Sequence, residues 1–143
     1  MSIRYVDSNV FIYAIVADEA SEKKALYCKK ILLKIAEGEL NAATSSLTWD
    51  EVVWSVRKLL DAKTSMKEGR ELLEFPNLRI LNVDHKVLGK AQKALERYSL
   101  KPRDAIHAAC CLENNIGELI SDDPDFDAVS GLSRIRLEEA ARS

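Results

Sequence analysis

Apolar residues in this chain follow two alternating patterns, short uninterrupted runs and longer stretches with a helical period. Short runs are typical of strands buried on both faces, and the longer stretches are typical of amphipathic helices. The predicted strands are residues 3–6, 40–46, 78–83 and 118–121, with residues 135–137 as a further strand at an edge. The predicted helices are residues 9–17, 21–39, 48–60, 65–75, 85–98 and 102–115, with a short helix at the C-terminus.

Strands separated by helices require crossover connections, which produce a parallel sheet covered by helices on both faces. The chain has 143 residues, the size of one ordinary domain, so we expect a single domain over residues 1–143. At this length roughly two-thirds of the unfolded surface can be buried, so neither a disulfide nor a metal is needed for stability. Ligands of such sheets bind outside the carboxyl ends of the strands.

Composition narrows the class of protein. An apolar share of 47% with 31% charged residues is typical of a globular protein. No apolar run approaches the roughly 18 to 20 residues of a membrane span, and the N-terminus does not resemble a signal peptide, so we expect no membrane association and a cytoplasmic location. Three cysteines without a CxxC spacing are expected to be buried and reduced. The net charge of −2 implies that any nucleic-acid binding depends on a local patch.

Four acidic residues fall where predicted strands end or helices begin. Asp7 follows the first strand, Asp123 follows the fourth, and Glu51 and Asp104 fall near helix starts. Each has a purely structural explanation, because acids near helix N-termini favour the macrodipole by about 0.3 to 1 kcal/mol. Asp7 is also a candidate N-cap, Thr48 with Glu51 fits a capping box, and the sequence SDDPD around Asp123 is ordinary turn chemistry.

The four acids taken together favour a metal site. If they converge, each pair of carboxylates about 5 Å apart repels by about 3 kcal/mol at an effective dielectric of about 20, so the cluster needs a cation. Oxygen ligands select Mg²⁺ or Mn²⁺, whereas zinc would require histidine or cysteine. A divalent ion of this kind supports hydrolysis of a phosphodiester bond.

Four motifs, in order, resemble the PIN domains, and most closely the small ribonucleases that are the toxins of VapBC toxin–antitoxin pairs. The motifs are YVDSNVFIY, TSSLTWDEVVW, KPRDAIHAA and LISDDPDF, and they extend over almost the whole chain. The resemblance implies an α/β/α sandwich of three layers around a parallel sheet of four or five strands. It also implies a Mg²⁺- or Mn²⁺-dependent endoribonuclease that leaves a 3′-hydroxyl and a 5′-phosphate.

Residue roles follow from the same resemblance. It implies that Asp7, Glu51, Asp104 and Asp123 form the acidic cluster, that Asp7, Asp104 and Asp123 hold the metal, and that Glu51 and Asp123 orient or deprotonate the attacking water. Ser8 and Asn9 match the family's hydroxyl and amide beside the first acid. The last motif selects Asp123 and Asp125 after Ser121, with Asp122 as an alternative to Asp123 in facing the metal. Arg103 is the best-placed cation for binding RNA.

The resemblance also implies partners for this protein, and other functions remain as alternatives. The resemblance implies an antitoxin that covers the acidic cleft and a homodimer that extends the RNA groove. An RNA-processing or decay nuclease of the same fold, and a catalytically silent RNA- or protein-binding module, are alternatives. A phosphorelay receiver also has an acidic sheet edge, but it requires paired acids after its first strand and a lysine near its last. In this chain the first predicted strand ends in one acid, and no lysine follows the fourth. His107 is interpreted as a packed or locally hydrogen-bonded histidine.

Overall fold

A computed structural model describes residues 2–18, 20 and 22–142. Its centre is a five-stranded sheet in the order β3-β2-β1-β4-β5, and every neighbouring pair of strands is parallel. The strands are β1 (Arg4–Val6), β2 (Ala42–Ser45), β3 (Leu78–Leu81), β4 (Glu118–Ile120) and β5 (Ser133–Ile135). The predicted parallel sheet is therefore confirmed, with five strands in the described part of the chain.

Helices connect the strands along the chain. They are α1 (Ser8–Val16), α2 (Lys23–Ala36), α3 (Ser46–Leu59), α4 (Ala62–Leu73), α5 (His85–Arg97), α6 (Pro102–Glu113) and α7 (Leu137–Arg142), with a 3-10 helix, η1 (Pro124–Ala128), after β4. Helix α4 begins three residues before the predicted start at Ser65, because the Asp61 side chain caps it by accepting from the Thr64 amide at 2.7 Å. The edge strand lies two residues before the prediction, since Ser133 to Ile135 pair with Glu118 to Ile120.

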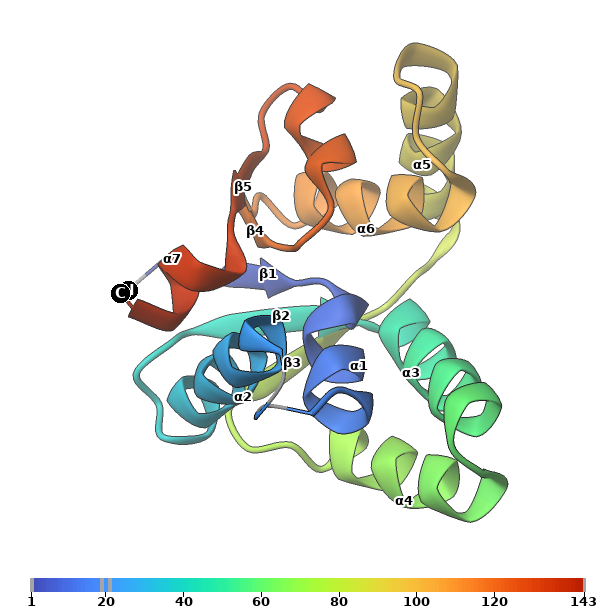
Figure 1. The fold of residues 1–143 in the computed structure, drawn as a ribbon. Helices are drawn as coiled ribbons and strands as arrows, with labels where there is room; N and C mark the ends of the chain where they lie inside the picture. The colour runs from blue at the N-terminus through green and yellow to red at the C-terminus, as the bar shows by residue number, and fades with distance from the viewer. Residues whose placement is uncertain (1, 19, 21, 143) are drawn as a thin grey trace.

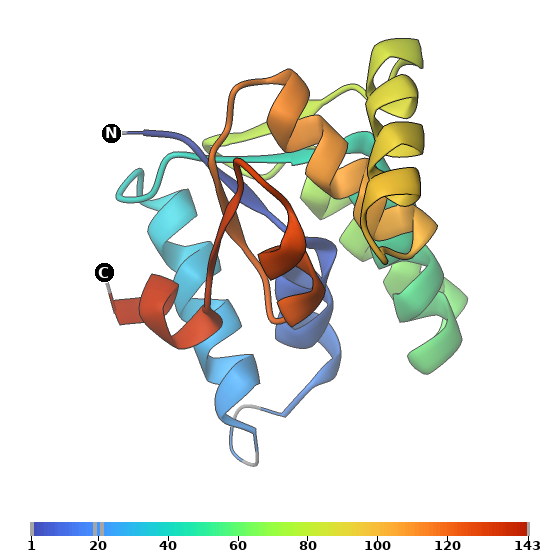
Figure 2. The ribbon, with the colours of Figure 1, turned by 90° about the horizontal axis from the view of Figure 1, so that it is seen from above.

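Two apolar layers lie against opposite faces of the sheet. Tyr5, Ala43 and Leu119 belong to the layer that packs under α5 and α6, whereas the adjacent residues on the same strands face the other layer. Figure 1 shows α5 and α6 on one side of the strands and α1, α2, α3 and α4 on the other, and Figure 2 gives the same arrangement from above. The three-layer α/β/α sandwich is thus confirmed.

The strand order also distinguishes this fold from that of a phosphorelay receiver. A phosphorelay receiver has the order 2-1-3-4-5, in which the third strand lies next to the first. Here β3 lies at the edge and pairs with β2 alone, while β1 lies between β2 and β4. The receiver hypothesis is therefore wrong.

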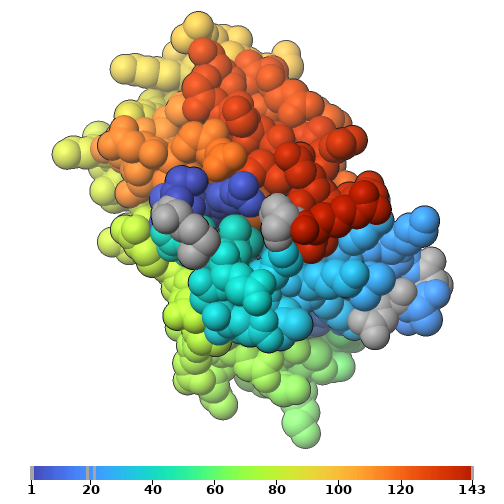
Figure 3. Space-filling view, turned by 90° about the vertical axis from the view of Figure 1, so that its left-hand side faces the viewer, coloured from blue at the N-terminus to red at the C-terminus, as the bar shows by residue number. Residues whose placement is uncertain are grey.

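Strands β1, β2 and β4 all point toward one edge of the sheet, where their carboxyl ends meet. Figure 3 shows the opposite side of the molecule, with the start of the first strand (blue) enclosed between the orange and red segments above and the cyan segment below. All three cysteines are buried and unpaired, as predicted. Within the described residues, none of the helices has both the length and the apolar character that crossing a bilayer requires.

Candidate active site

Asp7 occupies the floor of the carboxyl edge, directly after the central strand β1. Only 4% of its surface is exposed. Ser121, directly after β4, donates its hydroxyl to Asp7 Oδ2 at 2.6 Å, and the Asn9 amide donates to that Ser121 oxygen at 3.3 Å. Asp7 stands at the N-cap position of α1, but its side chain makes no capping hydrogen bond. Its carboxylate is thus available to the site and is not used to cap the helix.

Glu51 reaches the same floor from α3. The Ser8 hydroxyl lies 3.2 Å from Glu51 Oε1 and 3.3 Å from Asp7 Oδ1, so one serine bridges the two acids. The capping-box explanation of Glu51 is wrong. Helix α3 begins at Ser46 after the N-cap Ser45, which places Glu51 in the second turn, and the Thr48 hydroxyl is paired with that of Thr44 at 2.6 Å. We call Asp7 and Glu51 the inner pair.

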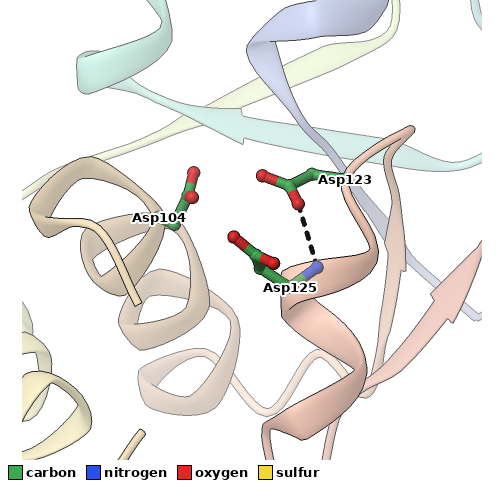
Figure 4. A group of neighbouring side chains, drawn as sticks. All are labelled: Asp104, Asp123 and Asp125. Atoms are coloured by element: carbon green, nitrogen blue, oxygen red, sulfur yellow. Dashed lines mark hydrogen bonds between the residues drawn. The ribbon is translucent and has the colours of Figure 1, made fainter. Parts of the chain in front are cut away.

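Three further carboxylates face one another above the inner pair. Asp104 lies in the first turn of α6, after Pro102 at the helix start, while Asp123 and Asp125 lie on the loop and 3-10 helix that follow β4. One carboxylate oxygen from each of the three side chains lies within 4.8 Å of the other two (Figure 4). The Asp125 amide donates to Asp123 Oδ1 at 2.9 Å, which turns Asp123 toward α6. We call Asp104, Asp123 and Asp125 the outer trio.

An open hollow of about 620 Å³ connects the two sets of acids. It is lined by Glu51, Lys101, Pro102, Arg103, Asp104 and Asp123. Of the four acids predicted from the sequence, three line this hollow, and the fourth, Asp7, is joined to Glu51 through Ser8. The two cations, Lys101 and Arg103, lie on the segment where α6 begins. The hollow therefore has acids on one side and positive charge at its rim.

Burial and the charges of neighbouring acids raise the pKa of two of these residues, Asp104 and Asp7. The pKa of Asp104 is raised to about 6, first by burial and then by the charges of Asp123 and Asp7. Burial also raises the pKa of Asp7, with the charge of Glu51 acting in the same direction, although His107 and Ser121 oppose the shift. Carboxylates in this state are stabilised by a cation that takes the place of the proton.

The donor set fits Mg²⁺ or Mn²⁺. The outer trio offers carboxylate oxygens only, which are the ligands that hard divalent ions prefer. Oxygens bound to one Mg²⁺ at about 2.1 Å lie at most about 4.2 Å apart, so small side-chain rotations bring the trio into reach of a shared ion. The raised pKa of Asp104 points the same way, because burial and then the charges of Asp123 and Asp7 disfavour its ionised form when no cation is bound.

Asp122 is directed away from the outer trio. Its carboxylate pairs with Lys24 Nζ at 2.7 Å and lines a separate hollow of about 350 Å³ together with Arg134 and Arg136. By contrast, the Asp123 amide donates to Ser121 Oγ at 3.0 Å, which holds the turn after β4 close to Asp7. Of the two adjacent acids, Asp123 is therefore the one that faces Asp104.

His107 lies next to both acids of the inner pair, whereas the sequence predicted a packed or locally hydrogen-bonded histidine. It is fully buried on α6, and its Nε2 lies 2.5 Å from Glu51 Oε1 and 3.6 Å from Asp7 Oδ1. Burial alone lowers the pKa of His107, but the hydrogen bond to Glu51 and the charges of Asp7 and Glu51 outweigh burial and raise it. The packing of His107 is confirmed, but the alternative of a local hydrogen bond is wrong, because its partners Glu51 and Tyr5 lie far away in the sequence.

Comparison with known proteins agrees with this architecture. The structures of several complexes are similar to this chain at low sequence identity. A VapBC2 complex from Rickettsia felis bound to a promoter DNA fragment has a TM-score of 0.68 and 20% identity over 94% of this chain and 98% of that chain. A toxin–antitoxin complex from Klebsiella pneumoniae has a TM-score of 0.63 and 22% identity over 91% and 95%.

A third similar structure is VapC20 of Mycobacterium tuberculosis, a toxin that cleaves the sarcin-ricin loop. It has a TM-score of 0.71 and 16% identity over 90% of this chain and 95% of that chain. At these identities the likeness concerns the fold. A search of curated proteins finds no match to the sequence. The PIN domain family model matches residues 4–132, nearly the whole chain, and the protein belongs to the PIN domain family.

Proposed function

We propose that this protein is a Mg²⁺- or Mn²⁺-dependent endoribonuclease and the toxin of a toxin–antitoxin pair. The observation that carries the proposal is the meeting of acids from β1, α3, α6 and the loop after β4 at one hollow with a cationic rim. Membership of the PIN family supports hydrolysis of a phosphodiester bond. The similar VapBC complexes support the toxin assignment.

Each acid has a role that follows from its position in the hollow. Asp104 and Asp123 hold the divalent ion, with Asp7 supporting them from the floor and Asp125 completing the ligand set from the rim. The ion, when bound, supplies a Lewis acid for the phosphate and makes nearby water more acidic. Glu51 orients the attacking water and accepts its proton, because it lines the hollow beside Asp104.

The rim of the hollow is suited to a polyanion. Lys101 and Arg103 lie beside Asp104 and provide the positive charge that an RNA backbone requires over an acidic site. Ser8 and Asn9 hold the acids in place. The Ser8 hydroxyl contacts both acids of the inner pair, and the Asn9 amide contacts Ser121. The sequence of the RNA target depends on contacts outside this hollow.

RNA cleavage tests the proposal directly. The purified protein should cut single-stranded or structured RNA with Mn²⁺ or Mg²⁺ and leave 3′-hydroxyl and 5′-phosphate ends, and EDTA should stop the reaction. Asp7→Asn should reduce the rate by at least about 100-fold, while Asp127→Asn, on η1 with its carboxylate paired to Arg134 of β5, should retain it. A protein that binds RNA but never cuts it would instead be a catalytically silent module.

An apolar groove supports the proposed antitoxin partner. It has a volume of about 360 Å³ and lies between α1, α2, α3 and α4, lined by Phe11, Ala14, Ile15, Lys29, Leu32, Val52, Glu68, Glu71, Leu72 and Phe75. The occupant we propose is an apolar segment of the antitoxin. Leu32→Glu should abolish binding to the product of the adjacent reading frame, whereas Leu88→Glu on α5 should not. A nuclease without a partner gene would be an RNA-processing or decay enzyme.

A second copy of the chain is the other proposed partner. Helices α3 and α4 carry several large exposed apolar side chains, namely Trp49, Trp54, Leu59, Met66 and Leu73. An exposed patch of this kind is typical of an interaction surface. Light scattering of the purified protein should give the mass of a homodimer, and Trp54→Glu should shift it to about 16.0 kDa, the mass of one chain.

A further inference from the structure

A line of buried polar side chains runs from the sheet to the inner pair. Ser45 Oγ lies 2.8 Å from Tyr5 Oη, and Tyr5 Oη lies 2.6 Å from His107 Nδ1. On the other side of the imidazole, His107 Nε2 lies 2.5 Å from Glu51 Oε1. Tyr5 and His107 are fully buried and Ser45 is 1% exposed, so these three side chains are shielded from water. Hydrogen bonds in such surroundings are strong and fix geometry.

Both nitrogens of the His107 ring have a defined partner. A carboxylate oxygen only accepts, so Nε2 carries the hydrogen that points to Glu51. Tyr5 holds the opposite edge of the ring, and the two rings pack edge to face with centroids 5.6 Å apart. Rotation of the imidazole about its bonds would break both contacts, so His107 presents one rigid donor to the site.

Glu51 depends on the His107 donor more than Asp7 does. The Glu51 side chain is long, and the two hydrogen-bond donors that it has among the described residues, Ser8 and His107, both contact Oε1. Ser8 is shared with Asp7, which has a separate short hydrogen bond from Ser121. With Oε1 fixed in this way, Oε2 is the oxygen of Glu51 that remains for the hollow.

We propose that His107, held by Tyr5, which is itself hydrogen-bonded to Ser45, is a positioning residue that holds Glu51 Oε1 and thereby sets the direction of the other Glu51 oxygen in the acidic hollow. This inference rests on the proposed nuclease function. His107 contacts neither RNA nor the ion in this account, and it acts only through Glu51. Residues that orient a catalytic or ligating group in this way typically change activity by about 10- to 100-fold when removed.

Two substitutions of His107 separate positioning from packing. The amide nitrogen of His107→Gln lies at the place of Nε2 and still reaches Glu51, whereas that of His107→Asn lies at the place of Nδ1 and serves Tyr5 alone. We expect His107→Gln to keep kcat for RNA cleavage within about 5-fold of the native enzyme, and His107→Asn to lower kcat by about 10- to 100-fold. KM and the Mn²⁺ dissociation constant should change by less than about 3-fold in both.

The matched control is His85→Gln, because His85 is the other histidine of the chain and lies exposed at the start of α5. Its kcat should equal that of the native enzyme. Equal kcat values for His107→Gln and His107→Asn, or a lower value for His107→Gln, would overturn the positioning role while leaving the nuclease proposal intact. A native protein that never cuts RNA would overturn the nuclease proposal instead.

A spectroscopic readout tests the contact without metal or activity. In the metal-free protein, ¹H–¹⁵N spectra of the imidazole should show a hydrogen on His107 Nε2 that exchanges slowly with water. Its resonance should shift strongly in Glu51→Gln and remain unchanged in Asp127→Asn. A His107 ring that lacks a protected Nε2 hydrogen, or one that is insensitive to Glu51→Gln, would refute the proposed hold on Glu51 even in an active nuclease.

Discussion

Replacing Asp104 with asparagine should make the metal-free protein more stable. The pKa of Asp104 rises from 3.8 to about 6, chiefly through burial and the charges of Asp123 and Asp7. A shift of about 2 units corresponds to about 3 kcal/mol. Because Asp104 is half-buried and solvent screens its charge, about 1 to 2 kcal/mol is the expected gain at pH 7.5. For a chain of this length that gain raises Tm by about 3 to 6 °C.

The contribution of Asp104 to the stability of the protein depends on pH. A carboxyl with a raised pKa contributes stability that is fully present below pH 3.8 and is lost as pH rises through about 6. The native protein in EDTA should therefore lose stability between pH 4 and 7, and the advantage of Asp104→Asn should shrink toward pH 4.5. Mn²⁺ should raise the Tm of the native protein but not that of the variant.

Thermal unfolding followed by circular dichroism measures these differences. The matched control is Asp127→Asn, because the hydrogen bond from Arg134 lowers the pKa of Asp127, so its loss should lower Tm at pH 7.5. If Asp104→Asn were less stable than the native protein in EDTA at pH 7.5, the cost of ionising Asp104 through burial and neighbouring charges would be refuted.

Two further predictions concern metal affinity and helix packing. The dissociation constant for Mn²⁺ should rise steadily below about pH 6, because Asp104 must release a proton before it binds the ion; titration calorimetry at pH 5 and 7.5 would disprove this if the two values were equal. A Cβ at Gly69 would lie 2.8 Å from Val53 Cγ2, whereas one at Gly89 would meet nothing within 4 Å, so Gly69→Ala should be about 1 to 3 kcal/mol less stable than Gly89→Ala in urea unfolding. Similar stabilities would mean that α3 and α4 pack loosely.

The architecture was predictable because apolar periodicity carries most of it. Short apolar runs mark strands that are buried on both faces, and the helices between them require a parallel sheet with its functional edge at the carboxyl ends. Element boundaries were less accurate where a polar side chain decides the end of a helix. Asp61 extends α4 toward the N-terminus through its bond to the Thr64 amide, which apolar periodicity alone does not reveal.

The partners of individual site residues were less predictable than the elements that carry them. Thr48 and Glu51 have the spacing of a capping box, but β2 continues into α3 at Ser45, so the helix starts earlier and Glu51 turns toward Ser8 and His107. His107 lies 56 residues from Glu51 in the sequence, and no local pattern encodes such a pair. The available signal in the sequence was a histidine three positions after an acid in an alanine-rich helical stretch.

Direct observation of a divalent ion tests the central claim. Crystals of the protein grown with Mn²⁺ and measured near the manganese absorption edge should show an anomalous peak about 2.2 Å from carboxylate oxygens of Asp104 and Asp123. The account predicts that this peak disappears in Asp104→Asn. A native crystal at saturating Mn²⁺ without a peak between α6 and the loop after β4, or with Mn²⁺ bound only elsewhere, would contradict it.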